Sequence, residues 1–522
     1  MLLTFSGSQG NFIEDAFFHN GASNLSIVSA STTEIVLINA ATGFTTTVTG
    51  SGFAFVGDSP VGGTITSMTF THGGVTQATL TGANMSVVAF DNALQDIEST
   101  DDHTAMAGLL TTGGLTVDAS TATDGLVMNY DLFSAAPNNM TIIGSDYQET
   151  LVGGAGNDSF TPGENDGEEF IAGSLGNDTY DYTQSHLSTD DGEYELYYGN
   201  FQSGITATLN GVTNTGSVTA TGSSDTLLGL ANVLDWDTDG YSFTGTDFND
   251  TINITIGESQ WIGVVGGLGN NIFNIDLTGD GAVRLNYQWS GTVSASSGVI
   301  ANYTTGVVSN NGHGGMDTVN LTLGAGSFQF RGTDHNDTVI GSAGKDQFIT
   351  EQGNDSIDGG DGWDILRYDR NGVSAMTIDM VAGTATGTWD GFSFTDTFAN
   401  IEEIRGSDFG DTITGDGNDN RIRGREGDDA IYGGAGEDRL EGEQGVDTLY
   451  GGENDDNLYG GSGNDALYGE TGEDHLEGDD GDDTLFGGSG EDRLEGGNDN
   501  DILYGGSVGV GHLEWRSLHR CY

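Results

Sequence analysis

Residues 406–504 read GSDFGDTIT GDGNDNRIR GREGDDAIY GGAGEDRLE GEQGVDTLY GGENDDNLY GGSGNDALY GETGEDHLE GDDGDDTLF GGSGEDRLE GGNDNDILY, one nine-residue phrase written eleven times without an insertion. The first position is Gly and the eighth is Ile or Leu in all eleven copies. The sixth position is Asp in ten copies, with Asn420 as the exception. Three such regular columns predict a repeat architecture in which every phrase forms the same small unit.

Each phrase is expected to form a turn of six residues followed by a strand of three. Glycine concentrates at the first and fourth positions, where it permits positive φ without a steric penalty. Asn418, Asn454 and Asp499 replace glycine at the fourth position, and these residue types tolerate the left-handed region. The one apolar residue of each strand, at the eighth position, is expected to point inward.

A second period, of eighteen residues, lies on top of the first. It appears at the ninth position, where alternate copies carry Tyr432, Tyr450, Tyr468, Phe486 and Tyr504, and the copies between them carry Glu441, Tyr459, Glu477 and Glu495. The structural unit is therefore expected to be a coil of two phrases, with aromatic side chains stacked on one outer face and Arg and Glu on the other. Such coils bury only what their neighbours cover, so several are needed for stability.

The phrase resembles GGxGxDxUx, the nonapeptide of the RTX (hemolysin-type calcium-binding) family. The resemblance implies a right-handed parallel β-roll with Ca²⁺ between turns that are stacked one coil apart. It also implies that turn carbonyls and sixth-position carboxylates hold the ions. The implied metal ligands are Asp411, Asp429, Asp438, Asp447, Asp456, Asp465, Asp474, Asp483, Asp492 and Asp501, together with Asp337, Asp346, Asp355 and Asp364 of a second block and Asp158 and Asp178 of a first.

The charge of the repeats agrees with this implication. Residues 406–504 carry 29 Asp and Glu against 5 Arg. Carboxylates stacked at the ~4.8 Å spacing of strands repel by about 1 kcal/mol per pair in water, and by about 3.5 kcal/mol at an effective dielectric constant of 20. Oxygen ligands with flexible coordination favour Ca²⁺ over Mg²⁺. The alternative interpretation is that these Asp residues only cap turns, as Asp often does.

Composition narrows the class of protein. The chain has 522 residues and a formal charge of −66, with 13 basic residues and none before Arg284. This composition argues against nucleic acid and anionic membranes as partners, because both require basic patches. Gly accounts for 88 residues and Pro for 3, which indicates turns and short strands. The single Cys521 excludes an intrachain disulfide, so metal is expected to stabilise the fold instead.

The whole chain is expected to be all-β, with β-roll blocks alternating with β-rich modules. Three similar modules, each leading into a repeat phrase, start near Tyr198, Tyr287 and Tyr368. The expected divisions are an N-terminal antiparallel β domain at 1–143, a first nonapeptide block at 144–181, β modules at 182–331 with isolated repeats at 245–274, a second block at 332–367, a β module at 368–405, the main β-roll at 406–506 and an atypical tail at 507–522.

Two features of the ends bear on localisation. The start, MLLTFSGSQG, has neither a positive segment nor an apolar core of a cleavable signal, and no apolar run is long enough to span a membrane. The tail changes composition abruptly after Gly506, which suggests a truncation or frameshift near residue 507. In lacking an N-terminal signal the sequence resembles RTX proteins, and this resemblance implies an extracellular protein that is exported by type I secretion.

The sequence gives little support for catalysis. It has no HExxH motif, and GGSVG at residues 505–509 lacks the flanking strand and helix of a nucleophile elbow. The nine His residues are scattered, with His335 and His475 at variable repeat positions. Carboxylate pairs such as Asp428 and Asp429 lie in repeat turns, where metal binding or surface charge explains them. Five Trp residues are interpreted as packing rather than a carbohydrate platform, namely Trp236, Trp261, Trp289, Trp363 and Trp389.

The expected function is that of a secreted calcium-binding protein with a structural, surface or adhesive role and no enzymatic activity. Its β-roll would fold on binding extracellular Ca²⁺, and its partner would be a cell-surface or matrix ligand. One alternative is an extracellular enzyme, polysaccharide-active or another hydrolase or lyase, whose active site lies in residues 1–143 or in the modules. Another is a pore-forming cytolysin, which needs a long apolar or amphipathic helical region that this sequence lacks.

Overall fold

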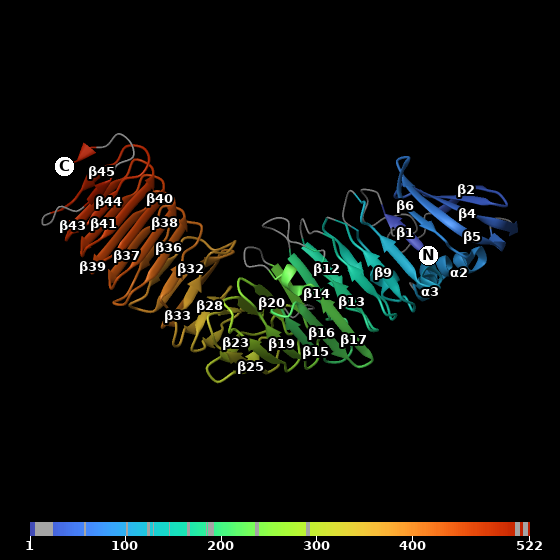
Figure 1. Cartoon of the computed structure of the whole chain (residues 1–522), viewed down its shortest axis with the longest axis horizontal. Helices are drawn as coiled ribbons and strands as arrows, with labels where there is room; N and C mark the ends of the chain where they lie inside the picture. Colours follow the sequence, from blue (N-terminus) through green and yellow to red (C-terminus); the bar gives the residue numbers. More distant parts are fainter. Residues whose placement is uncertain are drawn as a thin grey trace. The chain divides into compact units, whose positions relative to one another are not determined.

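The computed structural model describes residues 1–5, 25–56, 59–100, 103–122, 126–128, 130–145, 147–163, 168–183, 185, 193–234, 240–288, 293–506, 512–514 and 520–521. The chain divides into two units, residues 1–282 and 283–522. Short strands dominate both, as the alternation of single apolar residues with glycine-rich turns predicts (Figure 1). The fold is all-β, with stacked parallel strands and an antiparallel N-terminal region.

The N-terminal region of unit 1 begins as antiparallel strands, with β4 pairing β3 and β5. Its helices were not predicted from the sequence. Val87, Phe90 and Leu94 of α2 are buried and follow a helical spacing, which a count of apolar runs overlooks. The elements are β1 (Leu2–Phe5), β2 (Leu25–Ala30), β3 (Glu34–Asn39), β4 (Phe44–Val56), β5 (Ser59–His72), β6 (Val75–Thr81), β7 (Met85–Ser86), α2 (Val87–Thr100), α3 (Thr104–Thr111), β8 (Leu115–Asp118), α4 (Tyr130–Phe133) and β9 (Met140–Ile143).

Parallel stacking starts within this region, because β8 pairs β1 and β9 in parallel, and β9 pairs β11. The solenoid then continues through the rest of unit 1. Its elements are β10 (Thr150–Val152), β11 (Ser159–Thr161), β12 (Glu168–Ala172), β13 (Thr179–Asp181), β14 (Glu193–Tyr197), β15 (Thr206–Asn210), β16 (Thr215–Ala220), β17 (Ser223–Leu228), the 3-10 helix η1 (Leu230–Asn232), β18 (Gly240–Thr244), β19 (Thr251–Thr255), β20 (Trp261–Val265) and β21 (Ile272–Asp276).

The segments between repeat phrases contain three-stranded antiparallel meanders, β15–β16–β17 in unit 1 and β23–β24–β25 and β31–β32–β33 in unit 2. The first strand of each meander pairs in parallel with the repeat strand that follows it. From residue 282 to 405 the strands are β22 (Ala282–Asn286), β23 (Val299–Asn302), β24 (Val307–Asn311), β25 (Asp317–Thr322), β26 (Ser327–Arg331), β27 (Thr338–Ile340), β28 (Lys345–Ile349), β29 (Ser356–Asp358), β30 (Ile365–Arg367), β31 (Thr377–Asp379), β32 (Thr384–Trp389), β33 (Phe392–Ala399) and β34 (Glu403–Arg405).

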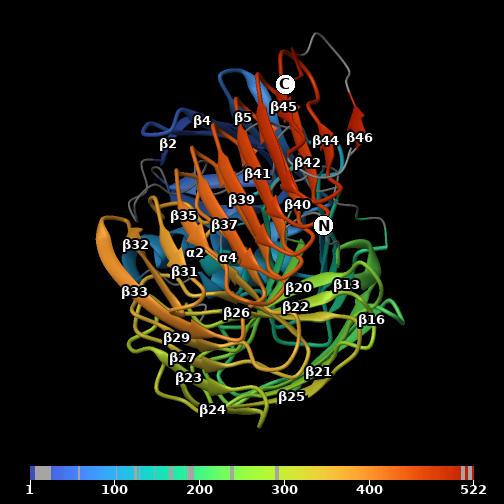
Figure 2. The same ribbon diagram turned by 90° about the vertical axis from the view of Figure 1, so that its left-hand side faces the viewer.

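The main roll places alternate phrases in two parallel stacks (Figure 2). Tyr432, Tyr450 and Tyr468 lie at one register in β37, β39 and β41, so the coil repeats every eighteen residues. The strands are β35 (Thr412–Thr414), β36 (Arg421–Glu426), β37 (Ala430–Ala435), β38 (Arg439–Gln444), β39 (Thr448–Glu453), β40 (Asn457–Ser462), β41 (Ala466–Thr471), β42 (His475–Asp480), β43 (Thr484–Ser489), β44 (Arg493–Glu495), β45 (Ile502–Tyr504), β46 (His512–Glu514) and β47 (Arg520–Cys521).

The interior and the outer faces of the roll follow the sequence pattern. Eighth-position residues from Ile413 to Leu503 are all buried. Neighbouring aromatic rings from Tyr432 to Tyr504 stack with centroids 4.6–4.9 Å apart. Arg and Glu side chains occupy the outer face of the other stack, where Arg423 pairs with Glu441. The predicted two-phrase coil is thereby confirmed.

Two details of the roll differ from the sequence prediction. Strands in its middle have six residues rather than three, because the second and third positions of the next phrase also pair with the neighbouring coil, as in Gly434 with Gly452. The tail after Gly506 does not end the stacking, since β46 pairs β44 and β47 pairs β45 in parallel. Residues 507–511, 515–519 and 522 lie outside the described residues, so the truncation hypothesis remains a prediction.

Candidate metal centre

The sixth-position Asp side chains of the main roll are buried in two columns, one for each stack of strands. Each column is held by one repeated hydrogen bond, in which a sixth-position backbone N–H donates to the carboxylate one coil later. The Asp429 N–H donates to Asp447 Oδ1 at 2.8 Å, and the Asp438 N–H donates to Asp456 Oδ1 at 2.8 Å. The sixth-position residues from Asp411 to Asp501 are each exposed by 3% or less. The turn therefore uses one carboxylate oxygen and leaves the second for another purpose.

The second carboxylate oxygen, Oδ2, accepts no hydrogen bond in most of the sixth-position Asp residues. A buried anionic oxygen without a donor is costly, because it has lost its water and gained nothing in exchange. Such an oxygen is normally neutralised by a proton or a cation. Among the described residues, ten of the sixteen predicted ligands have a buried Oδ2 with no hydrogen-bond partner: Asp355, Asp364, Asp429, Asp438, Asp447, Asp456, Asp465, Asp474, Asp483 and Asp492.

First-position glycines provide the space in front of these oxygens. A Cβ added to Gly442 would lie 2.3 Å from Asp447 Oδ2 and 2.6 Å from the carbonyl oxygen of Gly460 in the next coil. Any side chain would therefore displace one of the two oxygens. The sequence prediction that first-position glycines adopt positive φ is wrong, because positive φ occurs at the second and fourth positions, as at Gly434 and Gly436.

This donor set suits a hard divalent cation. A carboxylate oxygen and a turn carbonyl from adjacent coils border one small space, and oxygen-only coordination of that kind is typical of Ca²⁺. No group of three or more His, Cys, Asp or Glu side chains in the described part of the chain is placed to hold a metal. Backbone carbonyls must consequently provide much of any coordination shell, as the sequence resemblance implied.

Burial makes these carboxylates hard to ionise without a cation. It raises the pKa of Asp429 to about 8 and that of Asp447 to about 7, and the charges of neighbouring Asp residues add to the increase. The hydrogen bond from the preceding coil acts in the opposite direction but is too weak to restore the ordinary value. At neutral pH the empty column would hold part of its protons, and a divalent cation would replace them.

Five predicted ligands, Asp158, Asp178, Asp337, Asp346 and Asp411, have hydrogen bonds to both carboxylate oxygens. At Asp411, Oδ2 accepts the Ser407 N–H at 2.6 Å, while Oδ1 accepts the Ser407 hydroxyl at 2.9 Å and the Met376 N–H at 2.6 Å. Thr333 and Asp337 repeat this arrangement. We call this second-position Ser or Thr with its Asp the entry lock. Its geometry matches the turn-capping alternative.

Asp250, which the sequence analysis did not select, forms the same entry lock in unit 1. Its Oδ2 accepts the Thr246 N–H at 2.7 Å, and its Oδ1 accepts the Thr246 hydroxyl at 2.8 Å. Asn420, the one exception in the main column, behaves in a related way, because its Oδ1 accepts the Asp416 N–H at 2.8 Å. A Ser or Thr directly after the first-position glycine was the signal that could have identified entry locks.

The columns also continue into the modules through two residues that the sequence analysis missed. The Asp178 N–H donates to Asp225 Oδ1 at 3.0 Å, and the Asp355 N–H donates to Asp396 Oδ1 at 2.9 Å. Tyr198 donates its hydroxyl to Asp225 Oδ2 at 2.7 Å, and Tyr368 does the same to Asp396 at 2.9 Å. The sequence signal that could have identified Asp225 and Asp396 is the triplet Asp-Thr-Leu or Asp-Thr-Phe, which resembles the sixth to eighth positions of a phrase.

A family model described as RTX calcium-binding nonapeptide repeat (4 copies) matches residues 143–162, 331–369, 405–440, 441–476 and 477–507. The chain carries RTX calcium-binding nonapeptide repeats. These segments contain every predicted ligand except Asp178, and they support calcium binding by the repeats. No curated protein matches the chain at a significant level. No helix in the described part of this RTX-repeat protein is long and apolar enough to cross a membrane.

The remaining candidate side chains lie apart from the RTX columns. Trp261 and Trp389 are buried, consistent with packing, whereas Trp363 is 40% exposed. Trp236 and Trp289 lie outside the described residues, as does most of the GGSVG segment. His335 contacts the carbonyl of Ala295 at 3.2 Å, which fixes the ring at the surface. The positions of these Trp and His residues do not test whether the protein is an enzyme.

Proposed function

We propose that this chain is a secreted protein whose β-roll folds when Ca²⁺ binds between adjacent coils. The observation that supports this proposal is the set of ten buried carboxylate oxygens without hydrogen-bond donors in the repeat turns of the second block and the main roll. The ligands would be the Oδ2 atoms of these ten residues together with turn carbonyls such as that of Gly460. The entry-lock residues, such as Asp411, would serve as turn caps instead.

Calcium then acts as a folding switch. Extracellular calcium modules bind with dissociation constants of about 10⁻⁴ to 10⁻³ M. At cytosolic calcium the columns would stay empty, and the net charge of −66 would oppose compaction. Outside the cell, binding free energy becomes folding free energy. This supports export as an unfolded chain and a type I secretion route.

Circular dichroism of the full chain tests the switch. We expect a weak β signal in chelator and a full signal in millimolar Ca²⁺, with isothermal titration giving the number of ions. The same concentration of Mg²⁺ is the control, because Mg²⁺ requires a stricter octahedral geometry and should order the roll poorly. A complete β signal in chelator at neutral pH would contradict the proposal.

We further propose that the chain has a structural, surface or adhesive role without catalysis. Two observations support this role: most of the buried Asp residues belong to the repeat columns, and stacked repeats present long regular outer faces such as the aromatic row of β37, β39 and β41. Incubation of the calcium-loaded protein with alginates, esters and casein tests it. Turnover of any one substrate would favour the enzyme alternative, and dye release from liposomes would favour the cytolysin.

A further inference from the structure

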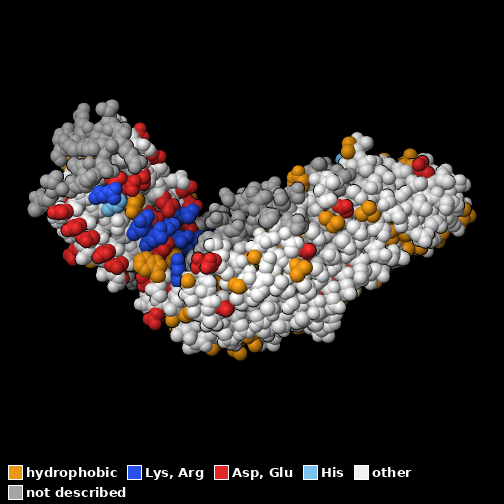
Figure 3. All heavy atoms as spheres, in the orientation of Figure 1, with side chains coloured by type: hydrophobic (Ala, Val, Ile, Leu, Met, Phe, Trp, Pro, Cys, Tyr) orange, Lys and Arg blue, Asp and Glu red, His pale blue; other side chains and the backbone are white. Residues whose placement is uncertain are grey.

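Positive charge is concentrated on one face of unit 2, although the chain as a whole is strongly acidic. Figure 3 shows most of the Lys and Arg side chains on the face in view gathered in one patch, with a smaller group apart from it beside a His. Eight of the 13 basic residues belong to β26, β30, β34, β36, β38 and the turn after β30. We call them the arginine patch: Arg331, Arg367, Arg370, Arg405, Arg421, Arg423, Arg425 and Arg439.

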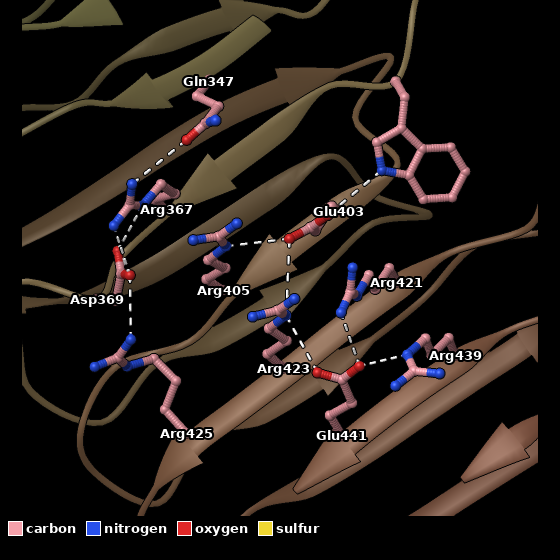
Figure 4. Close-up of polar contacts among 11 residues, drawn as sticks. Gln347, Arg367, Asp369, Glu403, Arg405, Arg421, Arg423, Arg425, Arg439 and Glu441 are labelled. Carbon is pink, nitrogen blue, oxygen red and sulfur yellow. Dashed lines mark hydrogen bonds and ion pairs between the residues drawn. The ribbon is translucent and has the colours of Figure 1, made fainter. Parts of the chain in front are cut away.

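The patch is built by strand register. Arg367, Arg405 and Arg423 occupy the same register in three successive parallel strands, so three like charges lie side by side. Carboxylates between them neutralise part of this charge. Arg405 pairs with Glu403 at 3.1 Å and Arg423 with Glu441 at 3.2 Å (Figure 4).

The pairing leaves an excess of positive charge. In the described part of the chain, seven of the eight arginines have ion pairs, and these pairs involve five carboxylates: Glu351, Asp369, Glu403, Asp408 and Glu441. The eight arginines therefore carry three more charges than these five partners. Neighbouring guanidinium groups repel one another, and a bound anion would reduce that repulsion.

A pocket of about 390 Å³ lies beside the patch. Three arginines of the patch line it, Arg331, Arg370 and Arg425, and so do three carboxylates, Glu351, Asp369 and Asp408. Trp389 forms part of the wall and is buried. A volume of this size suits a small molecule rather than a macromolecular surface.

Two of the three pocket arginines already have carboxylate partners. Arg331 pairs with Glu351 at 2.6 Å. Arg425 pairs with Asp408 at 3.0 Å and with Asp369 at 3.2 Å. Arg425 also adopts φ 88°, as second-position residues of the repeat turns such as Glu443 do.

Arg370 differs from the other two. Its Nε and Nη2 atoms are buried and have no hydrogen-bond partner. A buried guanidinium nitrogen without an acceptor loses its hydration without compensation. Burial lowers the pKa of Arg370, and the charge of Arg367 lowers it further. The guanidinium presents paired donors in a fork, which matches the paired oxygens of an oxyanion.

We infer that the pocket at Arg370 binds the oxyanion group of a small ligand, a carboxylate, sulfate or phosphate. Nε and Nη2 of Arg370 would donate to two oxygens of the group, while Arg331 and Arg425, which keep their carboxylate partners, would form part of the surrounding wall. The site draws residues from the second nonapeptide block, the module at 368–405 and the first coils of the main roll. Its assembly therefore depends on a folded unit 2.

Isothermal titration of the full chain in Ca²⁺ tests the inference, with inorganic sulfate, glucuronate and glucose 6-phosphate as probes and glucose as the uncharged control. We expect saturable binding of at least one charged probe and none of glucose, and the strongest probe identifies the source of the oxyanion. Equal binding of glucose, or no binding by any charged probe at millimolar concentration, would overturn it.

Variants locate the site. Arg370→Gln should weaken binding about tenfold or more, because a hydrogen-bonded charged pair is worth roughly 1.5–3 kcal/mol. The matched control is Arg439→Gln, which removes the same charge from the patch but outside the pocket, and it should change affinity less than about twofold. Circular dichroism in Ca²⁺ shows whether each variant folds, which separates loss of this site from failure of the calcium switch.

Should Arg370→Gln fail to fold, Arg370→Lys takes its place. Lys keeps the charge and loses the fork, so binding should weaken while the fold persists. Unchanged affinity in a folded Arg370 variant, or equal losses in the Arg370 and Arg439 variants, would reject a site at Arg370.

Discussion

Replacing three successive column carboxylates should affect stability in opposite directions with and without calcium. The variant carries Asp429→Asn, Asp447→Asn and Asp465→Asn. Each Asn keeps the oxygen that accepts the N–H of the preceding coil, at 2.7–2.8 Å in the present structure. The new amide nitrogen can donate to the turn carbonyl that borders the same space. The charge needed to hold a cation is lost.

The magnitude follows from the raised pKa values. Burial raises the pKa of these residues to about 8, 7 and 6, above the ordinary 3.8. A group whose folded pKa is raised stabilises the fold when protonated; the contribution is complete below about pH 4 and is lost as the pH rises through about 6–8. One pKa unit is worth about 1.4 kcal/mol. Because solvent near the turns screens these carboxylates, we discount the whole shift of each residue to about 1 kcal/mol, which gives roughly 3 kcal/mol for the three.

Far-UV circular dichroism measures both effects. In chelator the wild-type roll should gain β signal as the pH falls from about 8 to about 4, and the Asn variant should order at a higher pH because it needs fewer protons. In Ca²⁺ at neutral pH the variant should unfold at lower urea. The loss should be several kcal/mol, since charged hydrogen-bond or metal contacts contribute about 1.5–3 kcal/mol each.

The control variant makes the same three charge changes at entry locks: Asp250→Asn, Asp337→Asn and Asp411→Asn. There the oxygens accept N–H and hydroxyl donors, so an amide nitrogen would face another donor. The control should be destabilised both in chelator and in Ca²⁺. The reasoning is refuted if the column variant loses β signal in chelator as well, or keeps wild-type stability in Ca²⁺.

Three further predictions concern the same roll. Gly442→Ala should lower calcium affinity and cost about 1–3 kcal/mol in urea unfolding, whereas Gly417→Ala, whose Cβ would meet nothing within 4 Å, should be nearly neutral; equal effects would argue against a cradle at Gly442. Leu458→Ala, at a fully buried eighth position, should cost about 2–5 kcal/mol in calcium, and a loss below 1 would mean that the coil interior collapses around the gap. Tyr368→Phe should cost about 1–3 kcal/mol, because Asp396 Oδ2 loses its donor at 2.9 Å and keeps only the Thr350 hydroxyl at 3.5 Å; unchanged stability would show that the Thr350 bond is sufficient.

The repeat pattern predicted much of this architecture because each coil contacts mainly its neighbours. One inward residue per phrase fixes the strand face, so the buried positions of Leu440 and Leu449 follow directly from their place in the phrase. The aromatic row was predictable for the same reason. The α2 helix was missed because it lies outside the repeats, where tertiary packing against β5 decides the structure.

The candidate site was predictable at the level of residue type and less so at the level of atoms. The phrase identifies Asp411 and Asp447 as equivalent, yet Ser407 saturates the first and leaves no free oxygen. Asp396 was missed because the strand that carries it enters the column from a module rather than from a phrase. The unpartnered nitrogens of Arg370 depend on contacts among segments that are distant in sequence, and no local pattern encodes them.

The repeated hydrogen bond in each column gives the roll a direction. From Asp411 to Asp483 each coil donates forward to the coil after it, and Asp411, the first carboxylate of one column, accepts the N–H of Met376 in the preceding module. The carboxylate at the module end therefore has its donor before any repeat coil has folded, while each folded coil leaves one N–H donor for the coil that follows it. Folding should therefore propagate in one direction, from the module into the repeats.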